Sequence, residues 1–151
     1  MADFLSVDPG SRTGISLCSF SETEPLEHLR GWDVPGGTEG FIDWVVNNEP
    51  AGVQFIVYET FTLHGGKGTV LDSVEVIGAL KVLSHELEIP LHPQPPAGRV
   101  QAVPDEVLYR FDNTLRGKAH RNEKESLRHA LWYMKKKAHV PTLLKGWPRN
   151  D

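Results

Sequence analysis

The fold is decided first by residues 4–17, which are FLSVDPGSRTGISL. Residues 4–7 are rich in apolar side chains and are closed by the turn signal Asp-Pro-Gly, so we predict a short first strand. Residues 13–20 alternate in polarity and include β-branched side chains, which predicts a second strand. Residues 26–34, ended by Pro-Gly-Gly, are predicted to form a third. Connections this short favour an antiparallel arrangement of the three strands.

Beyond these strands, helical and strand patterns alternate. Thr38 is a candidate N-cap for a helix, because an apolar i, i+3, i+4 pattern follows it. Residues 53–58, VQFIVY, are nearly all apolar, as a buried central strand should be, and they end at Glu59. Residues 88–92 are predicted to form a last strand, which the proline-rich PQPP stops.

Longer periodic segments predict further helices. Residues 70–87 carry an apolar stripe at helical spacing, made of Val70, Val74, Ile77, Leu80, Leu83 and Leu87. Residues 105–115 and 121–137 are also expected to be helical. The apolar side of the last of these helices holds Leu127, Ala130, Leu131 and Met134. We expect the C-terminal tail, PTLLKGWPRND, to be irregular.

This order of elements predicts an α/β fold. The expected sheet is mixed and five-stranded, with three antiparallel strands followed by two parallel ones, and helices flank it. A chain of 151 residues can bury one ordinary core, so residues 1–151 are expected to form a single domain. The sequence has no long apolar run, no basic leader followed by an apolar segment, and one cysteine, Cys18. We therefore expect a cytoplasmic protein without a membrane partner.

The charge of the chain is distributed unevenly. Its formal net charge is −4, which argues against simple nucleic-acid binding. However, ten of the sixteen Lys and Arg residues lie within residues 116–149, where Glu123 and Glu125 are the only acids. From about residue 116 the chain is thus strongly basic, which suits a polyanionic partner. A solvated helix face is the alternative interpretation.

Two acids occupy the positions where an α/β sheet binds its ligands. Asp8 follows the first strand, and Glu59 follows the strand with the strongest apolar character. Ligands of open α/β sheets lie outside the carboxyl ends of the strands. Two carboxylates brought together there repel each other unless a cation lies between them, and Mg²⁺ prefers such oxygen ligands. The alternative for each is an ordinary acid in a surface turn or cap.

The last predicted helix offers further candidates. Glu125 and His129 are four residues apart and share a helical face, while Ser126 and His129 are three apart. On a helical projection, Glu125 and His129 lie roughly opposite Leu127 and Leu131. They therefore reach a metal only if the helix end overhangs the ends of the strands. The alternative is an acid and a histidine that face solvent.

Taken in order, these segments resemble the RuvC family of Holliday-junction resolvases, and RuvC-like resolvases of bacteriophages in particular. Residues 4–17 are similar to the family's opening strand, turn and second strand. Residues 56–61, IVYETF, resemble its fourth strand with the catalytic Glu. Residues 125–134, ESLRHALWYM, resemble its final helix, which carries two acids or an acid and a His. The resemblance implies a ribonuclease H-like fold, and a phage-encoded member would act in the host cytoplasm.

Roles carry over from the family residue by residue. Asp8 and Glu59 match its two strand carboxylates, and His129 falls at its last helix ligand. Glu125 would supply the remaining carboxylate. The commonest family pattern, two Asp three residues apart, would instead place Ser126 at that position, so both assignments stay open.

The resemblance also implies a mechanism and an assembly. Two Mg²⁺ ions per site would hydrolyse a phosphodiester, one generating hydroxide and the other stabilising the leaving oxygen. Mn²⁺ is expected to substitute, and preferentially so if His129 is a ligand, because Mg²⁺ disfavours nitrogen. His129 is otherwise a candidate proton shuttle. A homodimer would make paired cuts in branched DNA. We expect its interface on the helix of residues 70–87, with Val76 and Gly78 as candidate contacts or, alternatively, as residues packed inside the monomer.

Other residues are candidates for nucleic-acid binding. In position, Phe61 resembles the aromatic residue that family members insert at the junction centre; the alternative is a core residue beneath the loop. Lys67 lies in the Gly-rich loop of residues 60–69, where backbone and phosphate can approach closely. Further phosphate-contact candidates are Arg121, Lys135, Lys136 and Lys137.

Three other functions fit parts of the sequence. A related nuclease could act on RNA or on replication forks, and cleavage of matched branched and linear substrates would discriminate it. A non-catalytic nucleic-acid-binding module would not need the acids and the histidine. An actin-like ATPase also begins with an Asp, a Gly turn and a strand, but it needs a second lobe, for which 151 residues leave no room.

Overall fold

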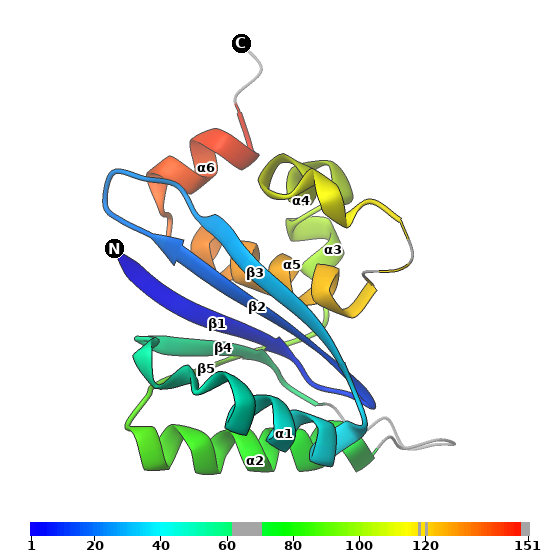
Figure 1. Ribbon diagram of the computed structural model, residues 1–151. Coiled ribbons are helices and arrows are strands. Elements are labelled where there is room, and N and C mark those ends of the chain that lie inside the picture. Colours follow the sequence, from blue (N-terminus) through cyan, green and yellow to red (C-terminus); the bar gives the residue numbers. More distant parts are fainter. Residues whose placement is uncertain (62–70, 118, 120, 149–151) are drawn as a thin grey trace.

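The computed structural model describes residues 1–61, 71–117, 119 and 121–148. Its centre is a five-stranded sheet in the order β3-β2-β1-β4-β5 (Figure 1). The pairs β1–β2 and β2–β3 are antiparallel, and β1–β4 and β4–β5 are parallel. The predicted mixed sheet is thus confirmed. The strands are β1 (Ala2–Asp8), β2 (Arg12–Phe20), β3 (Glu27–Pro35), β4 (Phe55–Glu59) and β5 (Leu91–Gln94).

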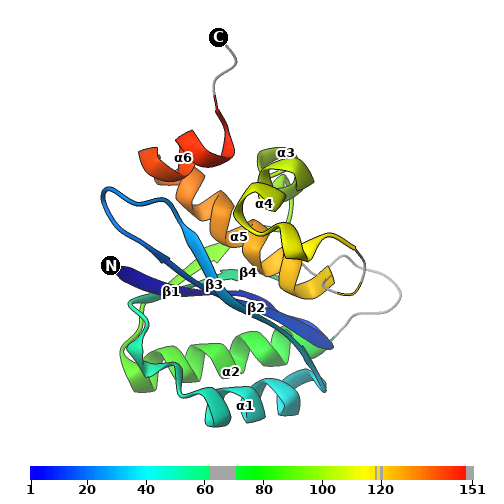
Figure 2. The ribbon, with the colours of Figure 1, turned by 45° about the horizontal axis from the view of Figure 1, so that its top comes forward.

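Helices cover both faces of the sheet, as the two views show (Figures 1 and 2). One face is covered by α1 (Gly37–Asn48) and α2 (Leu71–Leu87). The other face is covered by α5 (Arg121–Lys136), over which lie α3 (Arg99–Ala102), α4 (Asp105–Phe111) and α6 (Val140–Gly146). Single turns of 3₁₀ helix span Pro50–Gly52 and Asn113–Leu115. None of the described helices is long and apolar enough to cross a membrane.

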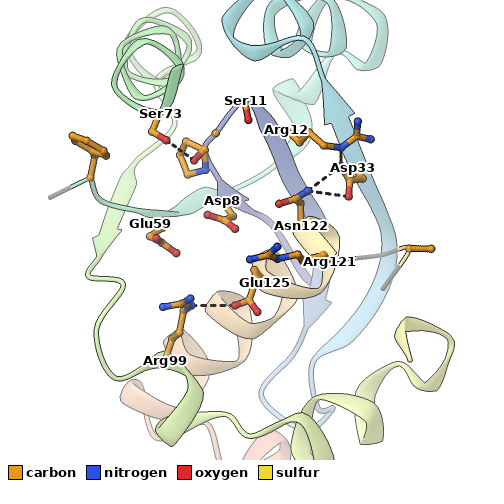
Figure 3. Close-up of a pocket in the computed structure, with 14 residues that line it drawn as sticks. Asp8, Ser11, Arg12, Asp33, Glu59, Ser73, Arg99, Arg121, Asn122 and Glu125 are labelled. Atoms are coloured by element: carbon orange, nitrogen blue, oxygen red, sulfur yellow. Dashed lines mark hydrogen bonds and ion pairs between the residues drawn. The ribbon is translucent and has the colours of Figure 1, made fainter. Parts of the chain in front are cut away.

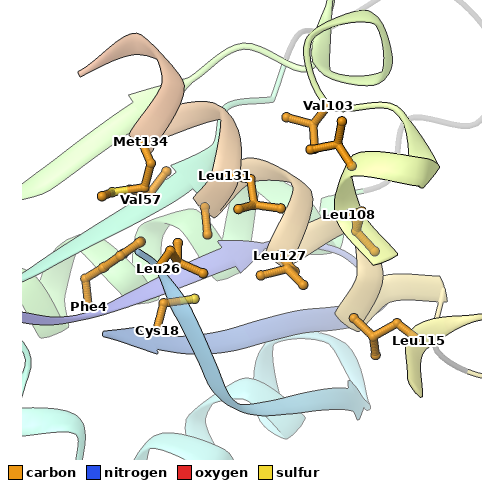
Figure 4. Packing of buried hydrophobic residues seen from close by; sticks show 12 residues of the cluster. Phe4, Cys18, Leu26, Val57, Val103, Leu108, Leu115, Leu127, Leu131 and Met134 are labelled. Carbon is orange, nitrogen blue, oxygen red and sulfur yellow. The ribbon is translucent and has the colours of Figure 1, made fainter. Parts of the chain in front are cut away.

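Each face of the sheet buries its own apolar cluster. Between the sheet and α5, the predicted apolar side of the last helix is fully enclosed: Leu127, Ala130, Leu131 and Met134 are at most 1% exposed (Figure 4). On the opposite face, Phe41 and Trp44 of α1 pack with Val76 and Leu80 of α2. The helix α5 therefore lies firmly against the sheet, which determines where its first turns stand.

Glycines in the sheet let the start of α5 come very close. A Cβ atom at Gly14 would lie 1.8 Å from the backbone oxygen of Asn122, and one at Gly31 would lie 1.9 Å from a side-chain oxygen of Glu123. Gly14 is also the cross-strand partner of Asp8. The N-terminal end of α5 thus lies beside the carboxyl end of β1. This placement allows side chains from the helix and from the strand to contribute to one site.

The expected apolar stripe of α2 is wrong in part. Val76 and Leu80 are its fully buried residues, whereas Val74 and Leu87 are 47% and 37% exposed. Val76 is therefore a core residue and not an interface residue. The cause is that α2 carries apolar side chains on more than one face, so periodicity alone does not select the inner one. Gly78 is exposed, and the space where its Cβ would stand is open.

Four local predictions also need correction. The predicted strand of residues 88–92 is shifted: β5 begins at Leu91 and continues through Pro93 to Gln94. It is an edge strand, where the missing backbone N–H of a proline is tolerated. The tail is not wholly irregular, because α6 forms within it. Thr38 is not an N-cap: the cap is Gly36, in the left-handed region, and the Thr38 hydroxyl donates to Glu75. The expected helix of residues 105–115 ends at Phe111 and is followed by the second 3₁₀ turn.

Candidate active site

Two of the predicted carboxylates stand side by side at the carboxyl end of the sheet. Asp8 ends β1 and Glu59 ends β4, and the two strands run parallel, with Val7 paired to Tyr58. Both side chains line an open pocket of about 710 Å³ (Figure 3). Glu125 reaches the same pocket from the first turns of α5. The structure therefore brings together three acids that are far apart in the sequence.

Crowding of negative charge perturbs Asp8. Burial and the neighbouring carboxylates of Glu59 and Glu125 raise the pKa of Asp8 from 3.8 to about 8, although Arg99 acts in the opposite sense. A side-chain hydrogen bond with Glu59 also favours the protonated form. A cation between these carboxylates would relieve their repulsion and lower the pKa of Asp8 again.

Glu125 differs from the strand acids because it is ion-paired. Its Oε2 lies 3.1 Å from Nε of Arg99 and 3.2 Å from Nε of Arg128. The Arg128 side chain is only 3% exposed and also binds Asp105 and the backbone oxygen of Val103. Arg99 is more accessible and lines the pocket. Glu125 is thus held in place from one side by a buried guanidinium and faces a second, accessible one in the pocket.

His129 lies behind the pocket and does not face solvent. Its ring is fully buried, with Nε2 at 2.6 Å from Oε2 of Glu59 and Nδ1 at 2.9 Å from Nε2 of Gln94. Ser126 is buried as well, and its hydroxyl lies 2.7 Å from that of Ser16. The alternative of an outward-facing histidine is therefore wrong. Both ring nitrogens of His129 have partners, and of Glu125 and Ser126 it is Glu125 that lines the pocket.

The donor atoms of the pocket suit a hard divalent cation bound mainly through water and substrate. Within the described ranges, no three His, Cys, Asp or Glu side chains are clustered closely enough to hold a metal by themselves. Mg²⁺ typically uses one or two carboxylates and completes its octahedron with water and phosphate oxygens. Asp8 and Glu59 fit that pattern, because they are adjacent, oxygen-bearing and mutually repulsive.

The predicted nucleic-acid residues are spread over the molecule. Phe61 and Arg121 line the pocket, and Phe61 is only partly buried. Lys67 lies outside the described residues. The remaining three candidates stand at the other end of α5, about 15 Å along the helix axis from Glu125. There each ammonium lies over an aromatic ring: Lys135 over Trp147, Lys136 over Trp132 and Lys137 over Tyr133.

Several residues in or behind the pocket are not predicted from the sequence. Arg99 begins a short helix that was not predicted, and Gln94 lies in the part of β5 beyond the expected stop. Asn122 lines the pocket and donates to Asp33, which also pairs with Arg12 at 2.9 Å. A signal for Asn122 was present: it lies three residues before Glu125, the spacing of the family's helix acids. With His129 as the last ligand, the same spacing points to Ser126 instead.

Comparison with known proteins identifies the fold. No family model and no curated protein matches the sequence. Among solved structures, Thermus thermophilus RuvC in complex with a Holliday junction substrate matches with a TM-score of 0.68, over 91% of this chain and 97% of that one. The chain has the ribonuclease H-like fold of RuvC. The sequence identity to that RuvC is 13%.

A viral resolvase has the same architecture. The fowlpox virus Holliday junction resolvase matches with a TM-score of 0.61 at 11% identity, over 89% of this chain and 99% of that one. Its complex with Holliday junction DNA matches with a TM-score of 0.64 at 13% identity. The RuvC-like fold that the sequence suggested is thus confirmed, and it extends over nearly the whole length of these proteins.

Proposed function

We propose that this chain is a metal-dependent endonuclease that cuts four-way DNA junctions. One observation carries the proposal: Asp8, Glu59 and Glu125 converge on one pocket at the carboxyl ends of β1 and β4, within a RuvC-like fold. Open α/β sheets bind their ligands outside the carboxyl ends of the strands. An ordinary solvated acid in a turn has no second acid beside it and keeps a low pKa. Asp8 lies beside Glu59, and its pKa is raised to about 8.

The residues of the pocket divide into anionic and cationic groups. Asp8 and Glu59 would hold Mg²⁺, with Mn²⁺ substituting, and Glu125 would approach from the helix. When bound, two such ions supply an activated water and stabilise the leaving oxygen of a phosphodiester. Arg99 and Arg121 line the same pocket and would meet the phosphate group of the strand to be cut. Arg99 would then exchange its pairing with Glu125 for a phosphate oxygen.

DNA with four arms is the substrate class that the neighbours favour. Two of the similar structures are complexes with Holliday junction DNA. Phe61 lines the pocket, and its partly exposed ring would stack on an unpaired base at a branch point. Cleavage of RNA or of replication forks by the same site is the second candidate, and only substrate comparison separates it.

A homodimer would supply the two symmetric cuts that junction resolution needs. The exposed side of α2 offers a surface for it: Leu71, Val74, Gly78 and Val82 follow one another at helical spacing, and the three apolar side chains are 64%, 47% and 63% exposed. Gly78 leaves a gap in the middle, where a second helix can approach closely. Sedimentation at micromolar concentration, with and without junction DNA, tests this assembly.

The activity is tested with a supercoiled plasmid that extrudes a cruciform. Two coordinated cuts linearise such a plasmid, whereas independent single nicks only relax it. We expect linear product that depends on Mg²⁺ or Mn²⁺, and no cutting of matched linear duplex or RNA. Relaxation without linear product would exclude paired resolution but keep a nuclease. No cleavage with either metal would favour the non-catalytic binding module.

A further inference from the structure

We infer that His129, oriented by Gln94, is a positioning residue that fixes the Glu59 carboxylate for cation binding. The inference rests on the proposed function, and it assigns His129 a role behind the metal site. Its starting point is the 2.6 Å contact between Nε2 of His129 and Oε2 of Glu59. The imidazole is fully buried, whereas the Glu59 side chain is 20% exposed and lines the pocket. One carboxylate oxygen is thus held from the protein side.

Gln94 determines which nitrogen of the ring carries the proton. It is the register partner of Glu59 in the pair β4–β5, and its side chain is 2% exposed. Its Nε2 lies 2.9 Å from the backbone oxygen of His129 and 2.9 Å from Nδ1 of the same residue. The backbone oxygen can only accept, which identifies the Gln94 atom as the amide nitrogen. That nitrogen has two hydrogens, one for each acceptor.

The tautomer of His129 follows from this geometry. Because Nδ1 accepts from Gln94, the ring proton is on Nε2, which donates to Glu59. The three side chains thus form one directed chain from β5 through α5 to the end of β4. A neutral donor orients the carboxylate without neutralising it. Glu125, by contrast, is held by two guanidinium groups. This difference leaves the negative charge of Glu59 available to a cation.

Strand pairing and burial fix the two strands and the helix that carry these groups. Glu59 and Gln94 are paired in the sheet, and the backbone N–H of Thr60 donates to the backbone oxygen of Gln94 at 2.9 Å. His129 lies in the middle of α5, among residues that are fully buried. Partners of this kind, which hold a metal-binding group through a hydrogen bond, typically contribute 10- to 100-fold to metal affinity.

The test is Mn²⁺ binding to the DNA-free protein, followed by the electron paramagnetic resonance signal of free Mn²⁺. His129→Leu places an apolar side chain in the buried space of the imidazole and removes the N–H that donates to Glu59. We expect its Mn²⁺ affinity to fall by about 10-fold or more. His129→Gln retains an N–H at similar reach and should recover most of the affinity. Gln94→Leu removes the hydrogen bond to Nδ1 of His129, so its Mn²⁺ affinity should also fall.

Thr142→Val is the matched control. Its hydroxyl is also fully buried and accepts from Leu26 N at 2.9 Å, but it lies in α6 away from the pocket. It should lower the melting temperature without changing Mn²⁺ affinity. In cleavage assays, the His129→Leu defect should appear as a higher half-saturating Mg²⁺ concentration, with cleavage at saturating Mg²⁺ largely recovered.

The outcomes separate this inference from the proposed function. If wild type and His129→Leu bind Mn²⁺ equally, the positioning role is wrong and the nuclease proposal stands. A wild-type protein without Mn²⁺ affinity would overturn both. If His129→Leu fails to fold, His129→Gln and Gln94→Leu decide. The directed chain is contradicted if His129→Gln binds Mn²⁺ no better than Gln94→Leu, or if Gln94→Leu binds Mn²⁺ like wild type.

Discussion

Gly14 of β2 lies directly beneath Asn122 of α5, so closely that a Cβ at position 14 would come within 1.8 Å of the Asn122 backbone oxygen. Because Gly14 also pairs with Asp8 across the sheet, this contact sets the distance between the helix acid and the strand acids. The close seating of α5 is therefore part of the site and not only of the core.

Replacing Gly14 by Ala should displace the start of α5. Overpacking of this kind typically costs about 1–3 kcal/mol, because the backbone of the helix must move. We expect a lower melting temperature together with a strong loss of junction cleavage. Gly52→Ala is the control, since a Cβ there meets nothing within 4 Å. A Gly14→Ala protein that is as stable and active as Gly52→Ala would contradict the seating.

The raised pKa of Asp8 predicts how stability depends on pH. Its folded pKa of about 8 exceeds the reference value of 3.8, so the folded protein binds this proton more tightly than the unfolded chain. In EDTA, wild type should therefore lose stability relative to Asp8→Asn as pH rises from 4 to 8, with no further change above. Near pH 8.5 the variant should be more stable by a few kcal/mol.

The same pair of proteins reports on the cation. Adding Mg²⁺ or Mn²⁺ near pH 8.5 should raise the melting temperature of wild type and leave that of Asp8→Asn unchanged, because the variant lacks one ligand charge. Thermal denaturation followed by circular dichroism measures both effects. A stability difference that does not vary between pH 4 and 8.5 would contradict the raised pKa of Asp8.

The prediction for the three lysines concerns salt. Changing Lys135, Lys136 and Lys137 to Ala should weaken binding to all DNA sequences alike, and each lost phosphate contact should flatten the slope of log affinity against log salt by roughly 0.9. Arg30→Ala is the matched control, because Arg30 also lies over an aromatic ring, that of Trp32, 4.8 Å away. If the slope of the triple variant equals that of the control, the lysines only pack on their rings.

The elements that the sequence predicted best are those with a strong local signal. The strand that ends at Glu59 is almost wholly apolar, and the turn at Asp8-Pro9-Gly10 is short and specific. The sequence could therefore place both acids at the carboxyl ends of strands. The apolar side of α5 likewise follows from its spacing.

Properties that depend on tertiary packing could not be predicted in this way. The projection of α5 set His129 opposite the apolar stripe, yet His129 is buried, because α5 is enclosed on more than one side. The role of Gln94 depends on β5 being an edge strand that tolerates Pro93, which is a property of the whole sheet. The pairing of Arg99 with Glu125 joins two segments with no common local pattern.

Cleavage and binding measured on the same synthetic four-way junction test the central claim most directly. Wild type, Asp8→Asn and Glu59→Gln are compared at moderate Mg²⁺ for cleavage, and in EDTA for junction affinity. We predict that both variants bind within a few-fold of wild type but lose cleavage, because each removes one ligand charge and leaves the basic surfaces intact. Cleavage by either variant near the wild-type rate would contradict the assignment of Asp8 and Glu59 as the metal-binding pair.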